Sequence, residues 1–263
     1  MIIAPLCSSS AANATFIGNR DSGVLIDAGC SYKKLRGFLS LCGIELSAIK
    51  AVLITHEHID HVKGLMQLTK HNDIPVYASC GTCGRLLEKE HVYNSDRLFD
   101  LDELDAAGLD LEVEAFSTPH DSAQSVGFII TCPSGYKTAY FTDLGEITAE
   151  VRESTLGADF VFIESNYDTQ LLRNNASYPQ FTKDRIKSHR GHLSNADSAD
   201  YILELVESGA TRIMLGHLSQ QNNTPQTAFG NTVSRLAAAG VRLGYDYTLD
   251  VAGVETAGEY IAI

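Results

Sequence analysis

Three histidines and one aspartate crowd into a single short run of this sequence. The run is His56-Glu57-His58-Ile59-Asp60-His61, and only Thr55 separates it from the apolar residues 51–54. Neutral imidazoles bind divalent transition metals, and carboxylates can bridge two of them. His56 and His58 point the same way if this segment is extended, while Asp60 and His61 fall where a helix begins. The density of ligand-type side chains therefore predicts a metal site.

The same arrangement recurs at three other places in the chain. The apolar stretches 115–117, 139–141 and 213–215 lead within three residues to His120, Asp143 and His217. Loops at the ends of rigid strands are where active sites form, so we expect these side chains to converge at one shared edge. Two metals about 3.5–4 Å apart can hold a bridging hydroxide as nucleophile. The pattern predicts a metal-dependent hydrolase.

Short β-branched or aromatic stretches alternate with amphipathic ones along the chain. This mixture predicts a layered α/β or α+β fold with helices covering the sheet faces. By periodicity and capping signals we expect strands at 24–27, 50–54, 75–78, 111–117, 126–131, 137–141, 159–163 and 212–215, and helices at 32–41, 61–70, 196–207 and 225–239.

Composition excludes several classes of protein. Of the 263 residues 44% are hydrophobic and 20% are charged, as in an ordinary globular chain. No apolar stretch is long enough for a membrane helix, and the first residues lack the basic start of a signal peptide, so a cytoplasmic location is expected. The six cysteines do not resemble a disulfide framework, which suits a reducing compartment. The net charge of −13 opposes long-range attraction of nucleic acid or an anionic membrane.

His192 is a further histidine that a metal centre does not need. A basic stretch precedes it, and Ser194 and Asn195 follow where a helix is expected to start. Backbone N–H groups at a helix start bind anions, so this region predicts a phosphate-docking edge. A solvated surface face is the alternative. The basic residues are Lys183, Arg185, Lys187, His189 and Arg190.

The His-x-His-x-Asp-His run resembles the signature of the metallo-β-lactamase superfamily, and the resemblance covers essentially the whole chain. It implies a four-layer αββα sandwich of class α+β, with two mixed sheets flanked by helices in a single domain over residues 1–263. It also implies two divalent metals, zinc first, with manganese, iron or nickel as alternatives. The implied ligands are His56, His58 and His120 for one metal, Asp60, His61 and His217 for the other, Asp143 as the bridge, and Asp27 in support.

Other segments are similar to one branch of that superfamily, the YycJ/WalJ-like 5′–3′ exonucleases. These are the Asn13-containing turn, Glu164-Ser165-Asn166, Gly191-His192, and Gly216-His217 with Asn222-Asn223. The resemblance implies that His192 protonates the leaving oxygen, with Asp60 also catalytic. The orienting partner of His192 is left open, because His189 stands where related tRNA-processing enzymes carry a Glu. Phosphate contacts are expected from Asn13, Arg190, Ser194 and Asn195.

These features predict phosphodiester hydrolysis, most simply at DNA or RNA ends. A small-molecule hydrolase of the same fold, cleaving a cyclic phosphodiester, thioester or lactone, is the alternative that the acidic net charge favours. The presence of Asp143 disfavours a true β-lactamase. A metal-binding regulatory module without activity is the non-enzyme alternative. No membrane partner is expected, and the oligomeric state is left open.

Overall fold

The chain folds into two compact units. The structure, a computed structural model, describes residues 1–104, 109–256 and 258–263. The first unit comprises Met1–Val113, Ser122–Val126 and Gly253–Ile263, and the second comprises Glu114–Asp121 and Gly127–Ala252. Within the described residues no helix has the length and apolar character needed to cross a bilayer. A single domain over the whole chain stays a prediction.

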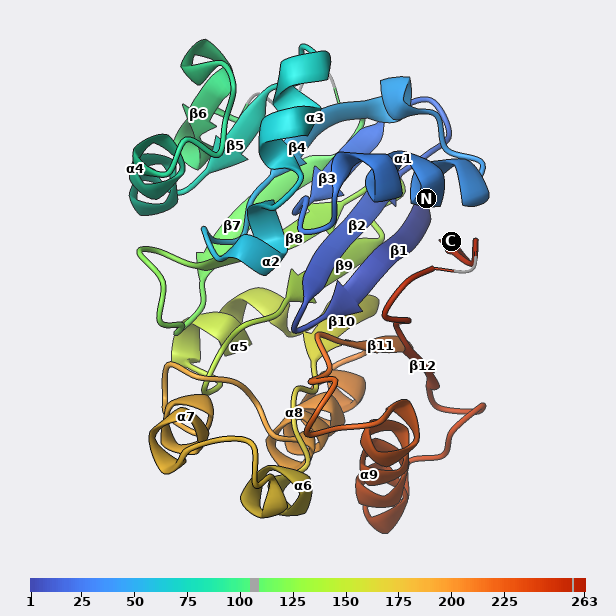
Figure 1. Cartoon of the computed structure of the whole chain (residues 1–263). Helices are drawn as coiled ribbons and strands as arrows, with labels where there is room; N and C mark the ends of the chain where they lie inside the picture. The colour runs from blue at the N-terminus through green and yellow to red at the C-terminus, as the bar shows by residue number, and fades with distance from the viewer. Residues whose placement is uncertain (105–108, 257) are drawn as a thin grey trace. The chain divides into compact units, whose positions relative to one another are not determined.

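The first unit is built on a seven-stranded mixed sheet (Figure 1). Its strand order is β13-β1-β2-β3-β4-β5-β6, with antiparallel pairing from β13 to β3 and parallel pairing from β3 to β6. Parallel pairing brings the carboxyl ends of β3 and β4 to the same edge. The bounds are β1 (Ile2–Ser9), β2 (Ala12–Gly18), β3 (Gly23–Ile26), β4 (Ile49–Leu53), β5 (Val76–Ala78), β6 (Leu98–Asp100) and β13 (Ile261–Ala262).

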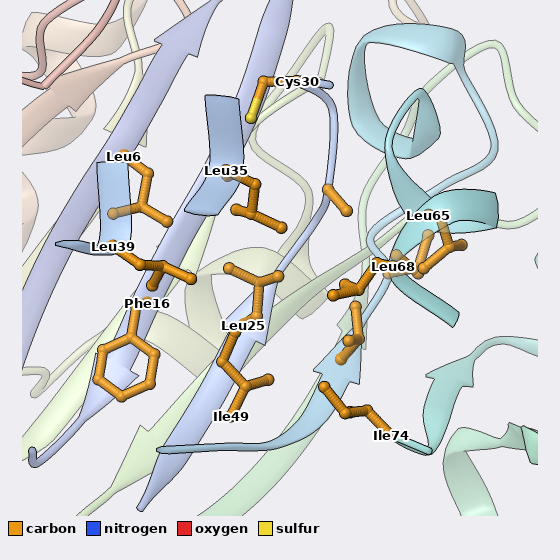
Figure 2. Packing of buried hydrophobic residues seen from close by; sticks show 14 of the residues in the cluster. Leu6, Phe16, Leu25, Cys30, Leu35, Leu39, Ile49, Leu65, Leu68 and Ile74 are labelled. Atoms are coloured by element: carbon orange, nitrogen blue, oxygen red, sulfur yellow. The ribbon is translucent and has the colours of Figure 1, made fainter. Parts of the chain in front are cut away.

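Helix α1 (Tyr32–Leu41) packs its apolar side on this sheet. Leu35 and Leu39, four residues apart, share one face of the helix. They lie among Leu6, Phe16 and Leu25 from the first three strands (Figure 2). Burial of this kind contributes about 25 cal/mol per Å² of apolar surface and holds the edge of β3 in place. The other helices of this unit are α2 (Ile59–Val62), α3 (Leu65–His71) and α4 (Cys80–Glu88), with short 3₁₀ turns at Leu46–Ala48, Ser95–Arg97 and Leu101–Glu103.

The second unit is built on a six-stranded mixed sheet in the order β12-β11-β10-β9-β8-β7. Strands β9 to β12 are parallel, and β8 pairs antiparallel with β9. Three parallel neighbours, β9, β10 and β11, therefore end at one edge. The bounds are β7 (Glu112–Ser117), β8 (Val126–Thr131), β9 (Lys137–Phe141), β10 (Phe160–Glu164), β11 (Arg212–Gly216) and β12 (Thr248–Val251), with helices α5 (Ala149–Thr155), α6 (Thr169–Asn174), α7 (Gln180–Ile186), α8 (Asn195–Glu207) and α9 (Pro225–Ala238).

Two mixed sheets with flanking helices confirm the predicted fold class. The expected strands and helices all appear within two residues of their predicted ends, except the helix expected at 61–70. That segment is α2 and α3, separated at Lys63-Gly64. A side chain at position 64 would put a Cβ 2.2 Å from the Cys30 carbonyl oxygen, so only glycine lets the chain pass here. The break is thus imposed by a close approach that periodicity does not reveal.

Candidate metal centre and its acid

In the first unit, the predicted imidazoles gather in the loop after β4. The ring centroids of His56 and His58 are 4.6 Å apart, and those of His56 and His61 are 4.1 Å apart. His56 and His61 are completely buried. Burying the polar nitrogens of two imidazoles costs folding free energy unless those nitrogens have hydrogen-bond or metal partners. The loop that was predicted from sequence therefore forms a compact cluster of ligand-type side chains.

Asp27, directly after β3, hydrogen-bonds to residues of this cluster and fixes their orientation. Its carboxylate accepts a hydrogen bond from Nδ1 of His61 at 2.7 Å. The backbone N–H and the hydroxyl of Thr55 also donate to it, at 2.9 and 3.1 Å. Burial raises the pKa of Asp27, and His61 and Thr55 oppose that rise. Because Nδ1 is used in this way, Nε2 is the nitrogen that His61 would present to a metal.

Close backbone contacts fix the distance between the Asp27 loop and the metal loop. Ala28 N–H donates to the carbonyl of His61 at 2.7 Å, and Gly64 N–H donates to the carbonyl of Ala28 at 2.8 Å. A Cβ at Gly29 would lie 1.6 Å from the Asp60 carbonyl oxygen. Glycine is therefore required where the two loops touch.

Asn13 lies fully buried beside the same ligands. Its side-chain amide donates to the Ser9 carbonyl at 3.0 Å. The same nitrogen is 3.1 Å from Nε2 of His61 and 3.5 Å from Oδ2 of Asp60. These contacts place Asn13 against the metal loop, and its predicted phosphate contact stays a prediction.

In the second unit, the carboxyl ends of β9, β10 and β11 deliver Asp143, Glu164 and His217. Together with His192, their ligand atoms all lie within 4.8 Å of one another. Nε2 of His217 is 3.1 Å from Oδ1 of Asp143. Two members of this set, Asp143 and His217, are predicted metal ligands, and an imidazole nitrogen beside a carboxylate oxygen suits a divalent transition metal.

Two aspartates and one histidine of the candidate site have left-handed backbone conformations. The φ angles are 60° at Asp27, 59° at Asp143 and 53° at His217. Only two other non-glycine residues of the described chain, Glu90 and Asp110, share this feature. The conformation is strained for residues with a Cβ and tends to persist where a functional geometry requires it. Each residue follows a strand, so the strained turn aims the side chain at the sheet edge.

His120 approaches Asp143 from the loop after β7. Its Nδ1 is 3.0 Å from the carbonyl of Gly191 and donates to it, which leaves Nε2 as the metal-binding nitrogen. That Nε2 is 3.7 Å from Oδ1 of Asp143. Nε of Arg190 donates to the His120 carbonyl at 2.8 Å. The predicted phosphate ligand Arg190 thus also supports the loop that carries His120.

His192 has a partner that sequence reasoning left open. Its Nδ1 lies 2.7 Å from Oε1 of Glu164, and the other oxygen of Glu164 accepts from the N–H groups of Leu144 and Leu193. Burial lowers the pKa of His192, but the Glu164 carboxylate, its hydrogen bond and Asp143 together raise it to about 9. Glu164 is the last residue of the buried strand β10, at the same sheet edge as the predicted ligands Asp143 and His217, and this position is the sequence signal that could have identified it.

Ser194 and Asn195 begin α8, as predicted, but their polar groups are used inside the protein. The Ser194 hydroxyl caps the helix by accepting from Asp197 N–H at 3.1 Å. The Asn195 N–H donates to the Tyr167 carbonyl at 2.9 Å, and its side chain bonds to Asn223 and Ser165. The predicted phosphate contacts of Ser194 and Asn195 stay predictions.

A buried amide network ties the later sequence motifs together. The side chain of Asn223 donates to the carbonyls of Ser165 and Asn166, and Asn166 donates to the carbonyl of His217 at 2.9 Å. Fully satisfied polar networks rigidify the residues they join. The network therefore stabilises the strained backbone at His217.

Acidic neighbours neutralise part of the basic stretch before His192. Arg185 pairs with Asp121, Lys187 lies 3.5 Å from Asp184, and His189 lies 3.0 Å from Glu146. Nζ of Lys183 donates to the backbone carbonyl of Arg173 at 2.8 Å. That carbonyl is neutral, so this contact does not neutralise the charge of Lys183. The stretch is basic, but less so than its sequence indicates.

The fold and these side chains define a class: metal-binding hydrolases of the metallo-β-lactamase fold. A model of the family described as the beta-lactamase superfamily domain matches residues 23–218. The chain therefore belongs to this superfamily.

Relatives and solved structures agree with this assignment. The chain is 32% identical over 228 residues to exodeoxyribonuclease YycJ of Bacillus anthracis, covering 85% of this chain and 84% of that protein. It is 30% identical over 256 residues to exodeoxyribonuclease WalJ of Streptococcus pneumoniae, covering 96% and 94%. The crystal structure of Zn(2+)-bound PqqB from Methylobacterium extorquens shares the fold, with a TM-score of 0.71 over both whole chains at 17% identity. The predicted resemblance to the YycJ/WalJ-like branch is confirmed.

Proposed function

We propose that this chain is a two-metal exonuclease that hydrolyses phosphodiester bonds at nucleic-acid ends, with DNA as the first candidate. The observation that carries the proposal is the Glu164–His192 pair beside Asp143 and His217. A metallohydrolase acting on a thioester or lactone needs no buried carboxylate to keep a histidine protonated. A phosphodiester with a poor leaving group does benefit from such an acid. The names of the two curated relatives favour DNA.

In this proposal the metal ligands are those that the family resemblance implies. His56, His58 and His120 would hold one metal, Asp60, His61 and His217 would hold the other, and Asp143 would serve both. When bound, the metals supply an acidified water and neutralise charge on the phosphate oxygens. Zinc is the first candidate, because imidazole and carboxylate ligands suit it, and manganese, iron and nickel are alternatives.

The chain's own residues divide the remaining work. Asp27 and the Gly191 carbonyl hold His61 and His120 with Nε2 presented for binding. Asp60 is both a metal ligand and a catalytic residue in this proposal. Glu164 keeps His192 protonated. The Nε2–H group of His192 then donates a proton to the oxygen of the departing nucleotide. A positioned acid of this kind contributes about 10²–10⁴-fold in rate.

A panel of substrates tests the proposal. It holds 5′-phosphorylated and 5′-hydroxyl DNA and RNA strands, an aryl phosphodiester and a thioester, each incubated with the metal-loaded protein. We expect the DNA strands to be shortened from one end. Hydrolysis of the thioester alone would overturn the proposal and support the small-molecule hydrolase, which the net charge of −13 favours.

A further inference from the structure

Asp121, the residue directly after His120, is not among the predicted metal ligands. Both residues belong to the second unit. One carboxylate oxygen of Asp121, Oδ1, lies 3.2 Å from Nε2 of His120. Nε2 is the nitrogen that His120 would present to a metal, because its Nδ1 donates to the carbonyl of Gly191. The carboxylate of Asp121 therefore lies beside the atom with which His120 would bind an ion.

The distance between these two atoms is the one expected for two ligands of a single ion. Imidazole nitrogens and carboxylate oxygens bind zinc at about 2.0–2.2 Å, so two of them at angles from 90° to tetrahedral lie about 2.8–3.6 Å apart. Among the predicted ligands, Nε2 of His217 and Nε2 of His120 lie 3.1 and 3.7 Å from Oδ1 of Asp143. Asp121 thus approaches His120 as closely as the predicted carboxylate ligand approaches its imidazoles.

The chemistry of the two groups favours a cation between them. With its proton on Nδ1, the neutral ring of His120 carries a lone pair on Nε2, and an ionised carboxylate offers only lone pairs. Two such atoms held 3.2 Å apart repel each other, and a divalent cation bound by both reverses the sign of the interaction. The alternative is an imidazolium at His120 whose Nε2–H donates to Asp121. Only the first arrangement makes the carboxylate a ligand, so metal affinity distinguishes the two.

Arg185 on α7 holds the same carboxylate. Its Nε donates to Oδ2 of Asp121, the oxygen that is not used towards His120. Carboxylates that bind metals are themselves hydrogen-bonded by residues outside the ligand set, and this contact fixes their orientation. A guanidinium stays charged at every physiological pH, so the contact persists whatever else changes at the site. Arg185 therefore fits the role of a positioning residue for Asp121.

We propose that Asp121 is a further ligand of the metal that His120 binds, and that Arg185 positions its carboxylate for that role. The proposal rests on the metal centre of the proposed function, but not on its substrate. Imidazole ligands suit zinc, whereas carboxylate oxygens suit manganese. The added oxygen of Asp121 therefore raises the affinity of this site for manganese relative to zinc.

Asp121→Asn tests the ligand by metal binding alone, with no substrate present. The amide keeps the shape of the side chain and removes its charge. We expect the Kd for Mn²⁺, measured by competition with a fluorescent chelator, to rise by at least about 10- to 100-fold, the loss typical of residues that only support a ligand. The Kd for Zn²⁺ should rise less. If Asp121 only pairs with an imidazolium of the metal-free protein, removing it leaves both affinities unchanged or strengthens them, and either result would overturn the assignment.

Arg185→Gln tests the positioning role on a side chain that is half exposed, so the fold should persist. We expect the Kd for Mn²⁺ to rise by about 10-fold or more in the wild-type background. In the Asp121→Asn background it should not rise further, because no carboxylate remains to be positioned. A purely electrostatic effect has the opposite sign, since removing one cation favours the binding of another. Tighter binding, or an equal loss in both backgrounds, would therefore exclude the positioning role.

Asp184→Asn is the matched control for the loss of one negative charge. Asp184 is exposed and pairs with Lys187 on the same helix. We expect its Kd for Mn²⁺ to stay within about twofold of wild type, because solvent and salt screen an exposed charge. A rise equal to that of Asp121→Asn would assign the effect to net charge and overturn the proposal.

Metal binding also separates this inference from the proposed function. Wild type that takes up no metal would overturn the proposed metal centre and Asp121 with it. Wild type that binds metal as tightly as Asp121→Asn does would overturn the role of Asp121 alone. If the metals bind as proposed but no nucleic acid is cleaved, the exonuclease proposal fails, and the difference in Mn²⁺ affinity still supports Asp121 as a ligand.

Discussion

Nδ1 of His192 donates to Oε1 of Glu164 over 2.7 Å, and the two residues lie 28 positions apart in the chain. Glu164 is fully buried, and its other oxygen is held by two backbone N–H groups at 3.2 Å. A buried carboxylate fixed in this way is costly unless a cation sits beside it. The pair therefore favours an imidazolium at position 192, with Nε2–H directed away from Glu164.

Replacing His192 by alanine should remove the acid without removing the metals. We expect turnover of a phosphodiester with an alkyl leaving group to fall by about 10²–10⁴-fold. A 4-nitrophenyl leaving group needs no proton, so its hydrolysis should change far less. Metal content by mass spectrometry serves as the control and should be unchanged. Unaltered turnover of the alkyl substrate would exclude His192 as the acid.

Glu164→Gln should act through His192. Removing the carboxylate removes the main cause that raises the pKa of His192 to about 9, so that pKa falls. The imidazolium is then lost at lower pH, and the alkaline decline of kcat for the alkyl substrate moves towards neutral pH. The loss at neutral pH should be about 10- to 100-fold, as for other orienting partners. Glu146→Gln, which removes the partner of the exposed His189, is the matched control and should leave the pH profile in place.

Metal removal should lower both activity and thermal stability. Two equivalents of metal per chain are expected after reconstitution, and Asp143→Asn should hold one or fewer. A ligand at a hundred times its Kd stabilises a protein by about 2.7 kcal/mol, so chelation should lower the Tm measured by calorimetry. Equal Tm values with and without chelator, or full metal content in Asp143→Asn, would contradict the assigned ligands.

Asp27→Asn tests whether the carboxylate that accepts a hydrogen bond from Nδ1 of His61 supports metal binding. Asparagine tolerates the left-handed backbone at this position, so the fold should persist. The neutral amide supports the imidazole less well, and metal affinity should weaken about 10- to 100-fold in a competition titration. Asp110→Asn makes the same change at another left-handed aspartate, which is exposed, and should leave affinity unaltered.

Gly64→Ala should destabilise the first unit. The new Cβ would meet the Cys30 carbonyl at 2.2 Å, and displacing backbone costs about 1–3 kcal/mol. Gly230→Ala is the control, because that glycine lies inside α9 with no atom within 4 Å of the added Cβ. It should stabilise the protein by up to about 1 kcal/mol. Urea unfolding should therefore give opposite signs for the two variants.

The sequence by itself predicted the metal loop, the strand ends that carry His120, Asp143 and His217, and most of the helices and strands. Hydrophobic periodicity and ligand spacing are local properties, so they can be recognised without coordinates. Tertiary structure alone decided that Glu164 supports His192, because parallel pairing and a long connection bring the two together. It also decided the break at Gly64, the left-handed turns at Asp27, Asp143 and His217, and the neutralisation of Arg185 by Asp121. Each depends on residues distant in the chain meeting in space, which no local pattern encodes.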